Sequence, residues 1–510
     1  MNKNIRSILV YFRQIALMLL FLVFSALSFS GTAAGSVSST PEYVAPVAED
    51  FSSLPWSESF DKLHSKFSRE YGFTEWKKID WTALYKRIKP LVERAEASND
   101  FTAYYLAMRE YVNSIPDGHV HMSSIRDIND KYIGGGFGFS ATKLSDGRVI
   151  ASWVDETSAV YAQGMRAGAE LIEWNGRPVK DVLNEVSTIF GPNSATAEVL
   201  ANQQVHYLTR APVNTRLSLL FSNITGGTAK ASVSAYDDKG KSLVKTYPST
   251  VVSDGLRDWI LEVENPGKKP ESMVEKRLLE GNIGYIKIWG EIDVDLKETG
   301  TAPSTLGLFK SALAEFNKLK VRGLILDIRN NVGGLDSMSA EILGLFSREK
   351  ALYEYASFYN SATGTFQILP DDLSDLNNPD YALYIEPDEP FFGGPVAALI
   401  NSKCVSSGEG LAMGIKDLPR GETVGFYGTN GSFGMAGGGA KIPGNIVVHW
   451  PYGQSLDKDK EVQIDSRDGI GGVSPSIRTP MTLENALRAA RGEDVELEHA
   501  IKVINSCAAE

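Results

Sequence analysis

The stretch that decides the fold is Ala397-Ala-Leu-Ile400-Asn-Ser-Lys-Cys-Val-Ser406-Ser407-Gly-Glu409-Gly-Leu-Ala-Met413. The apolar run 396–400 predicts a buried strand and residues 409–415 predict a helix, so the small residues between them form a strand-to-helix turn. A serine at such a turn lies where the amides that start a helix point outward and favour developing negative charge. Ser406 is therefore a candidate nucleophile.

The same spacing also has a purely structural explanation. Ser406 can act as a helix N-cap with Glu409 three residues later, which is the spacing of a capping box. Capping boxes are common and catalytic serines are rare, so the spacing taken alone favours the cap. Only motifs elsewhere in the chain can decide between the two.

Strands and helices alternate on both sides of this turn. We expect strands at 283–289, 321–328, 396–400 and 422–425, and helices at 308–318, 337–346 and 409–415. This alternation predicts an α/β layered sheet with crossover helices within residues 241–510. Ligands of such sheets gather at the carboxyl ends of the strands. Two motifs follow strands in this way, the Ser406 turn and Leu326-Asp-Ile-Arg-Asn-Asn-Val-Gly333-Gly334.

The composition is that of a globular protein with several domains. The chain has 510 residues, of which 43% are hydrophobic and 22% charged, and this length is enough for two or three domains. Its formal net charge is -12. Because there is no basic surplus to neutralise phosphates, we expect no nucleic-acid partner.

The first residues have the features of a secretory signal peptide. Basic residues are followed by the apolar run 15–29 and by small residues, with a cleavage site expected after Ala34. This run is short for a membrane-spanning helix. We therefore expect an exported, periplasmic or extracellular protein that meets the membrane only if the segment stays uncleaved. Residues 35–50 have the composition of a linker.

Helical periodicity dominates residues 51–130, which we expect to form an N-terminal helical domain. Asp80 and Asp100 stand in front of apolar periodic segments and are expected helix caps. The last of these helices runs into Asp117-Gly118-His119. A histidine in a loop is usually solvated or structural, so His119 alone indicates little about catalysis.

Residues 131–240 change to strand periodicity and resemble a PDZ domain. Gly136-Phe137-Gly138-Phe139 is similar to the carboxylate-binding loop of that family, and residues 158–179 are similar to its helix, strand and turn signature. Asn175-Gly176 predicts a tight turn after the strand of residues 169–174. The resemblance implies that extended peptides bind by adding a strand to an exposed edge near these four residues. Residues 181–210 carry more helix than a minimal PDZ domain needs, which leaves room for an altered or covered groove.

Five motifs occur along the chain in one order: Asp80-Trp-Thr-Ala-Leu-Tyr85, Asp117-Gly-His119, the segment 326–334, Ser406-Ser-Gly-Glu409 and Gly472-Val-Ser-Pro475. In this order they resemble the tail-specific, or carboxy-terminal processing, serine peptidases, whose relatives include the tricorn core protease and interphotoreceptor retinoid-binding protein. The resemblance covers about residues 60–504. It implies a multidomain α+β protein with a crotonase-like layered sheet in its catalytic domain, and it favours the nucleophile over the cap for Ser406.

The resemblance also implies roles for single residues. Ser406, three residues before the glutamate, corresponds to the nucleophile. The implied oxyanion donors are backbone amides, that of Ser407 and one from Gly333 or Gly334, where glycine allows close approach to a substrate carbonyl. An acidic partner is implied near residues 472–475. Asp468 is the nearest match and Asp465 the next, and the frequent aspartate after the motif's proline is Ser476 here.

One departure from the family concerns the base. The processing-protease branch carries a lysine downstream of the serine, but residues 424–434 contain none. The tricorn-like branch uses a histidine, whose position matches His119. A histidine with a pKa of about 6.5 needs little tuning to act at neutral pH, whereas a lysine must be buried to do so. We therefore expect His119 as the base rather than Lys403, Lys416 or Lys441.

These motifs together predict a serine peptidase that hydrolyses proteins or peptides by acyl transfer, without a cofactor. The alternative is a catalytically silent peptide- or ligand-binding protein on the same fold, which a serine-reactive phosphonate would distinguish. An esterase of the α/β-hydrolase type is disfavoured because no Gly-x-Ser-x-Gly surrounds Ser406. No His-Glu-x-x-His motif occurs, so we expect no metal. The sequence leaves the substrate and the oligomeric state open.

Overall fold

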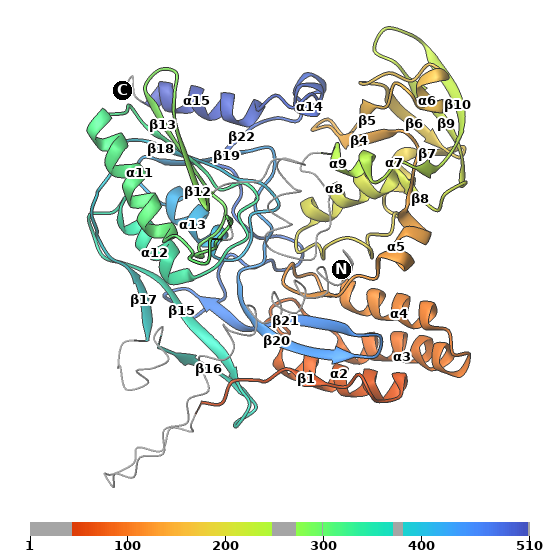
Figure 1. Cartoon of the computed structure of the whole chain (residues 1–510), viewed down its shortest axis with the longest axis horizontal. Coiled ribbons are helices and arrows are strands. Elements are labelled where there is room, and N and C mark those ends of the chain that lie inside the picture. The colour runs from red at the N-terminus through yellow and green to blue at the C-terminus, as the bar shows by residue number, and fades with distance from the viewer. Residues whose placement is uncertain (1–42, 247–271, 298, 371–380, 508–510) are drawn as a thin grey trace.

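The computed structural model describes residues 43–246, 272–297, 299–370 and 381–507 (Figure 1). The expected signal peptide and the first half of the expected linker, residues 35–42, lie outside these ranges. Within them, no helix combines the length and the apolar character that a membrane crossing requires. The fold is a multidomain α+β arrangement of helices, a β-rich domain and a layered α/β region.

The α/β region is built on a six-stranded sheet in the order β12-β13-β14-β18-β19-β22. All but β12 run parallel, and β12 joins the edge antiparallel to β13. The strands are β12 (Val274–Leu279), β13 (Ile283–Ile288), β14 (Leu324–Asp327), β18 (Val396–Leu399), β19 (Gly421–Gly425) and β22 (Ile477–Arg478). The expected alternation of strands and helices is therefore confirmed.

Helices cover both faces of this sheet, which explains why its inner strands β13, β14 and β18 are mainly apolar and wholly buried. One face packs against α11 (Thr305–Leu319), α12 (Asp336–Gly344) and α13 (Ser407–Lys416), and the other packs against α15 (Val495–Cys507) (Figure 1). Strands β14 and β18 are neighbours in register, with Asp327 opposite Leu399. The loops after these strands, which carry the two motifs, therefore leave the sheet side by side.

A second sheet of seven strands contains long antiparallel strands that the sequence analysis does not anticipate. It comprises β1 (Glu49–Asp50), β2 (His121–Met122), β15 (Ala351–Asn360), β16 (Thr365–Leu369), β17 (Ala382–Ile385), β20 (Gly434–Ile442) and β21 (Ile446–Leu456). Buried and half-buried residues alternate at the start of β21, from Ile446 to Trp450, as expected of a strand with one covered face. The sequence of this segment does not alternate in the same way, because the half-buried Val447 is apolar, but its β-branched and aromatic residues could have predicted the strand.

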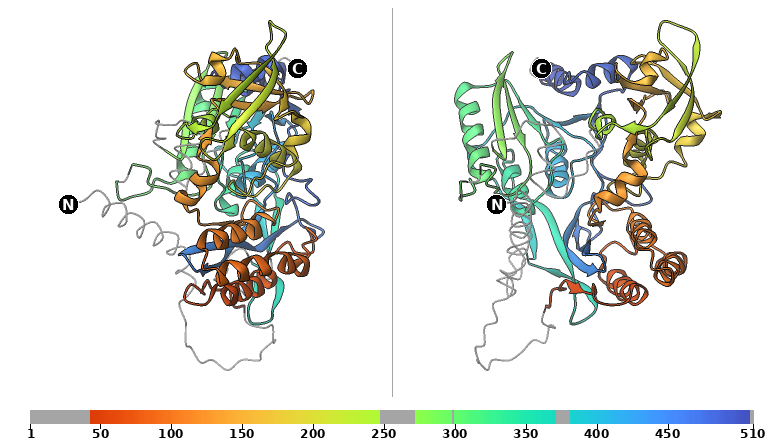
Figure 2. Two further views of the ribbon diagram at one scale, coloured as in Figure 1. Left: turned by 90° about the vertical axis from the view of Figure 1, so that its right-hand side faces the viewer. Right: turned by 45° about the vertical axis from the view of Figure 1, so that its right-hand side comes forward.

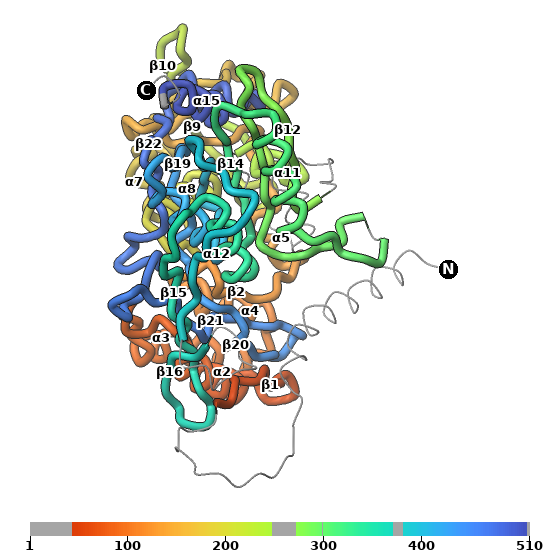
Figure 3. Tube along the Cα trace, turned by 90° about the vertical axis from the view of Figure 1, so that its left-hand side faces the viewer, coloured from red at the N-terminus to blue at the C-terminus, as the bar shows by residue number. Residues whose placement is uncertain are grey.

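The N-terminal helices do not form a core of their own. Helices α2 (Trp56–Glu70), α3 (Trp81–Ala97) and α4 (Phe101–Asn113) pack on the β20–β21 hairpin, as Figures 1 and 3 show. Trp450 of β21 is fully buried there, with its ring stacked 4.6 Å from that of Phe67. The helical layer is thus completed by residues from the other end of the chain, while the expected caps Asp80 and Asp100 accept bonds from the first turns of α3 and α4.

The β-rich domain has the order β10-β9-β6-β5-β4 and lies above the helical layer in Figure 1 and in the right-hand view of Figure 2. Its main elements are β4 (Phe139–Lys143), β5 (Val149–Val154), β6 (Glu170–Trp174), β9 (Arg216–Ser222), β10 (Thr228–Ser234) and α8 (Ala197–Leu208). The tight turn expected at Asn175-Gly176 is confirmed, since both residues have positive φ, 51° and 76°.

Short elements connect these parts. They are β3 (Gly135–Gly136), β7 (Arg177–Pro178), β8 (Arg210–Ala211), β11 (Tyr236–Asp237), α5 (Arg126–Ile133), α6 (Ala159–Ala162), α7 (Val179–Leu183), α9 (Lys241–Val244) and α14 (Leu483–Ala490). Of these, α9 packs on the edge strand β4, where the Ser140 hydroxyl donates to the backbone oxygen of Ser242.

Candidate active site

Ser406 lies in a strained turn between β18 and α13. Its backbone has φ 58° and ψ -135°, a region that residues with a side chain rarely occupy. Such conformations cost about 1–3 kcal/mol and concentrate at functional sites, and a strained serine between a strand and a helix is the geometry of a nucleophile elbow. The Ser406 side chain makes no capping hydrogen bond. The capping-box interpretation therefore does not describe this turn, and the hydroxyl is left for other chemistry.

Two backbone amides beside Ser406 make no recorded hydrogen bond among the described residues, those of Ser407 and Gly334. The amide of Gly333 is different, because it donates to Asn331 Oδ1 at 2.8 Å. The prediction that Gly333 is an oxyanion donor is therefore corrected, and Ser407 and Gly334 remain. Gly333 has another role: with φ +77°, a Cβ there would lie 2.6 Å from the Cβ of Ser406, so only glycine allows this approach.

A loop of residues 429–432 supports the nucleophile from the other side. Ser432 accepts the amide of Ser406 on its backbone oxygen at 3.0 Å. The buried Glu409 carboxyl holds this loop by accepting the Thr429 hydroxyl at 2.6 Å and the amides of Gly431 and Ser432 at 2.7 and 2.8 Å. Burial raises the pKa of Glu409 to about 7 despite these donors. Glu409 therefore fixes the loop rather than completing a capping box.

The same loop binds the turn that carries His119. The amide of Gly118 donates to Ser432 Oγ at 2.7 Å. Ser432 thus bonds directly to Ser406 through its backbone and to the residue before His119 through its side chain. The structure therefore brings together two predicted residues that are 287 positions apart in the sequence.

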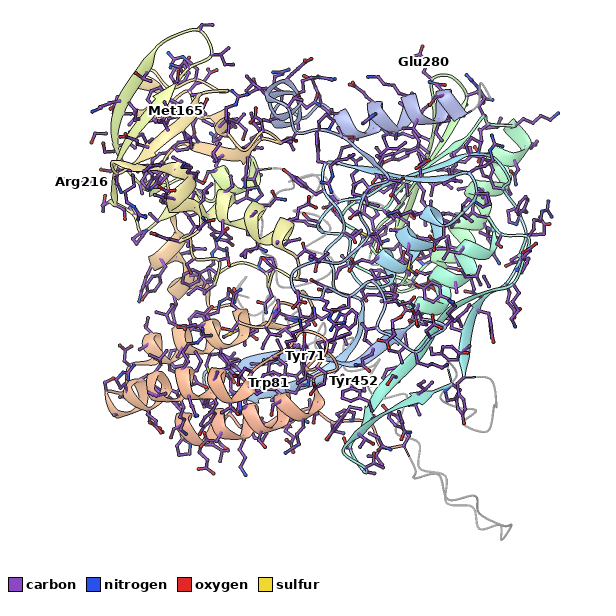
Figure 4. The ribbon with its side chains drawn as sticks, turned by 180° about the vertical axis from the view of Figure 1, so that it is seen from behind. Tyr71, Trp81, Met165, Arg216, Glu280 and Tyr452 are labelled. Atoms are coloured by element: carbon purple, nitrogen blue, oxygen red, sulfur yellow. The ribbon has the colours of Figure 1, made fainter. Side chains whose placement is uncertain are left out.

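Asp117 is the carboxylate closest to His119, with its Oδ1 3.6 Å from His119 Nδ1. Asp117 also accepts the Tyr71 hydroxyl at 2.8 Å. Tyr71 and Trp81 lie together where the helical layer meets the β20–β21 hairpin (Figure 4), with ring centroids 6.0 Å apart. Behind Asp117, the ammonium group of Lys77 lies 3.9 Å from Asp117 Oδ2 and 2.6 Å from Asp465 Oδ1.

The buried charges around His119 raise its pKa. Burial alone would lower the pKa of His119, but the nearby carboxyl groups of Asp117, Asp465 and Glu409 outweigh it and raise the pKa above its usual value. Burial alone would raise the pKa of Asp117, but Lys77 and His119 hold it well below its usual range. An ionised Asp117 therefore faces an imidazole that readily takes up a proton.

The predicted acidic partner Asp468 lies elsewhere. Its side chain is 54% exposed and forms a surface ion pair with Lys78 at 2.9 Å. Asp465, three residues earlier, is fully buried beside Lys77 and accepts the amide of Phe433 at 3.0 Å. The preference for Asp468 is therefore corrected in favour of Asp465, the second of the two matches. Lys77 and Tyr71 carry no motif, and no signal in the sequence could have identified them.

The lysines that could replace His119 have other surroundings. Lys416 Nζ donates to the backbone oxygen of Ser474 at 2.9 Å, and Lys441 lies 3.8 Å from Asp50 on β1. Burial lowers the pKa of Lys403 to about 7, which is suitable for a base. Burial and the charge of Lys403 also lower the pKa of His206 to about 3. Lys403 therefore lies near His206, which belongs to α8.

The four residues predicted to bind peptide do not line an open groove. Phe137 and Phe139 are buried in the core of the β-rich domain, both edge-on to Trp174. Gly136 lies in β3, which pairs on both sides with β8 and β11. A Cβ on Gly138 would lie 2.4 Å from Ser158. The edge strand β4 is itself buried from residue 139 to 142, so a peptide cannot add to it in this conformation.

Within the described ranges, no three His, Cys, Asp or Glu side chains are grouped so that they could hold a metal ion. The carboxyl groups of the candidate site are instead held by Lys77, Tyr71 and backbone amides.

Comparison with known proteins agrees with the motifs. Residues 282–477 match peptidase family S41, and residues 136–220 match a PDZ domain. No curated protein matches the sequence with statistical significance. Among solved structures, mature CPAF complexed with lactacystin is 15% identical, with a TM-score of 0.59 over 89% of this chain and 99% of that one. Mature CPAF alone is 16% identical, with the same TM-score over 89% and 98%.

At this identity the CPAF structures show a shared fold and nothing further about the site. The S41 match, by contrast, covers β13, β14, β18 and the Ser406 turn, whereas the turn that carries Asp117 and His119 lies outside the matched residues. The PDZ match covers the β-rich domain from β3 to β9. The chain therefore contains a peptidase family S41 region and a PDZ domain, and we identify it as a serine-type peptidase.

Proposed function

We propose that this peptidase hydrolyses peptide bonds by acyl transfer, with Ser406 as the nucleophile and His119 as the general base. The observation that carries the proposal is the pair of hydrogen bonds made by Ser432, which accepts the Ser406 amide on its backbone oxygen and the Gly118 amide on its hydroxyl. The strained backbone and uncapped hydroxyl of Ser406 support the same role.

In the proposed reaction, Ser406 Oγ attacks the carbonyl carbon of the scissile peptide bond while its proton passes to His119 Nε2. Nδ1 of His119 faces Asp117, which leaves Nε2 for the serine. The amides of Ser407 and Gly334 bind the oxyanion. The carbon–nitrogen bond then breaks, the imidazolium gives its proton to the leaving amine, and a water molecule activated by His119 hydrolyses the acyl-enzyme.

Asp117 and Asp465 supply the charge that favours the imidazolium. Both are fully buried, so their effect on His119 is weakly screened. Lys77 lies between the two carboxyl groups and balances part of their charge. We propose that Asp117 orients His119 and that Asp465 acts through Lys77 and through its field.

Lys403 is the second candidate for the base, because burial lowers its pKa to about 7. Its position beside His206 on α8 favours a role at the boundary with the PDZ domain instead. His119→Ala and Lys403→Met distinguish the two: the proposal expects the first to be inactive and the second to keep most of its activity.

The proposed substrates are proteins or peptides of the cell envelope. This part rests on the basic and apolar residues that begin the sequence, which are typical of export. The buried edge of β4 indicates that substrate enters at the catalytic site without strand addition to the PDZ domain in the conformation described here.

The test compares the wild-type protein with Ser406→Ala on a peptide library, followed by labelling with a serine-reactive phosphonate. The proposal expects cleavage and labelling by the wild type and neither by Ser406→Ala. A folded wild-type protein that binds peptides but neither cleaves them nor takes up the label would be a silent binding protein. Equal cleavage by both proteins would exclude Ser406 as the nucleophile.

A further inference from the structure

The side chain of Asn331 holds the backbone of the loop that carries Gly333 and Gly334 by a hydrogen bond. This side chain is fully buried, and its Oδ1 accepts the amide of Gly333 at 2.8 Å. The backbone oxygen of Asn331 accepts the amide of Val405, the residue before Ser406, at 3.1 Å. A Cβ on Gly408 would lie 2.5 Å from Asn331 Oδ1, so the start of α13 also packs on this amide. Asn331 thus contacts both the glycine loop, residues 333–334, and the turn that carries Ser406.

Glu291 holds Asn331 in turn. Its Oε1 accepts Asn331 Nδ2 at 2.8 Å, while its backbone amide donates to the oxygen of Gly333 at 3.1 Å. Its backbone oxygen accepts the amide of Leu335 at 2.8 Å. Glu291 therefore bonds to the glycine loop on both sides of Gly334, whose Cα has no room for a side chain because a Cβ would lie 2.2 Å from the Glu291 oxygen.

We propose that Asn331 and Glu291 are a positioning pair that fixes the Gly334 amide relative to Ser406, so that the Gly334 and Ser407 amides converge on one oxyanion. This inference rests on the proposed function, since it needs Ser406 as the nucleophile. Neither side chain touches the substrate. Their effect passes through the backbone of residues 333–334 and of Val405.

Burying the polar side chains of Asn331 and Glu291 lowers the stability of the fold, which indicates a role other than packing. Glu291 is fully buried, and its Oε2 has no hydrogen-bond partner among the described residues. A buried polar group without its full set of partners destabilises the fold, so an apolar side chain of similar volume would be the more stable choice for packing alone. A hydrogen-bonded amide and carboxyl fix the direction of a backbone N–H, which apolar contacts cannot do.

The experiment uses Asn331→Leu, Glu291→Leu, the double variant and Glu291→Gln in the full chain. Glutamine keeps an oxygen that can accept Asn331 Nδ2, and leucine keeps the approximate volume without it. We expect kcat to fall roughly 10- to 100-fold for each leucine variant with KM nearly unchanged, as for a misplaced oxyanion donor. The double variant should lose little more than either single one, because the pair acts as a unit. Glu291→Gln should stay within about threefold of wild type.

Two binding measurements separate positioning from a general loss of structure. A peptide aldehyde, which forms a tetrahedral adduct with the serine, should bind the leucine variants more weakly by about the factor lost in kcat/KM. An uncleaved peptide should bind equally to Ser406→Ala with and without Glu291→Leu. The matched control is Glu70→Leu, because Glu70 is also a buried glutamate with one oxygen lacking a partner, but it lies in α2. It should leave kcat unchanged.

Failure of this inference is distinguishable from failure of the proposed function. If Ser406→Ala remains active, the proposed nucleophile is wrong. If Ser406→Ala is inactive but folded Glu291→Leu and Asn331→Leu keep wild-type kcat and aldehyde affinity, the nucleophile stands and the positioning pair is refuted. Equal losses in Glu291→Gln and Glu291→Leu would also refute it, because the accepting oxygen would then not be the cause.

Discussion

Replacing Lys77 with methionine removes the ammonium group that lies 2.6 Å from Asp465 and 3.9 Å from Asp117, while keeping a side chain of similar length. The Lys77 side chain is 1% exposed and both carboxylates are fully buried, so solvent screens the lost interactions little. Removing one partner from a buried ion pair costs about 3–5 kcal/mol, mainly because the other charge stays buried without compensation. We expect a loss of this size for Lys77→Met in urea unfolding at pH 7.

The same substitution should change the pH dependence of activity. A general base must be neutral to accept the serine proton, so kcat/KM rises as the pH passes through the pKa of His119. That pKa is already raised, since Asp117, Asp465 and Glu409 outweigh the effect of burial. Without Lys77, the ionised Asp117 acts on His119 with less compensation, so the rise in kcat/KM should shift to higher pH. A profile of kcat/KM from pH 5 to 9 measures this shift.

Lys66→Met is the matched control. Lys66 and Glu70 form another buried ion pair in the same helical layer, with side chains 5% exposed. This variant should lose comparable stability without shifting the pH profile. The reasoning is refuted if Lys77→Met is as stable as wild type, or if both lysine variants shift the profile by the same amount.

Four further outcomes are expected. Ser406→Ala should abolish peptidase activity and change the free energy of unfolding by less than about 0.5 kcal/mol, because its hydroxyl caps nothing; loss of activity in step with unfolding would contradict this. His119→Ala should lose about as much kcat/KM on one peptide as Ser406→Ala, and the double variant should lose little more. His121→Ala should lose little activity. Near wild-type activity in His119→Ala would exclude His119 as the base. Burial raises the pKa of Glu291 from 4.5 to about 7, so its contribution to stability is complete below pH 4.5 and is lost as the pH rises to 7. In urea titrations, Glu291→Gln should remove about 3 kcal/mol of this dependence of stability on pH. An unchanged dependence in the variant would count against the raised pKa. Mass spectrometry of the exported protein should find that about the first thirty-four residues are absent, whereas an intact N-terminus on a cytoplasmic protein would contradict export.

The spacing of Ser406 and Glu409 suggests a capping interaction that the structure does not contain, although it draws attention to the serine that is the candidate nucleophile. The sequence offers a serine with a glutamate three residues later, which fits a capping box. In the structure the glutamate turns inward to bind the loop of residues 429–432, and the serine backbone adopts a conformation that does not cap. A local pattern cannot distinguish these outcomes, because the competing partners come from a loop that is distant from the turn.

What the sequence by itself determined is the part of the protein governed by local periodicity and turn chemistry. Apolar runs alternating with helical segments specify the parallel sheet, in which β13, β14, β18 and β19 all lie where expected. The caps Asp80 and Asp100 and the turn at Asn175-Gly176 follow from side-chain and backbone preferences of the residues themselves. Motif order was enough to identify the family and to select Ser406 and His119 as candidates.

The tertiary structure decided which polar groups are buried and with which partners. Asp465 and Asp468 are three residues apart and chemically identical, yet one is buried beside Lys77 and the other is exposed beside Lys78. The same holds for Gly333, whose amide is occupied only because Asn331 is folded against it. Charges and hydrogen bonds of this kind depend on distances between segments far apart in the chain, and burial multiplies their strength by excluding water. The cluster around His119 therefore exists only once the helical layer, the β20–β21 hairpin and the catalytic sheet have packed together.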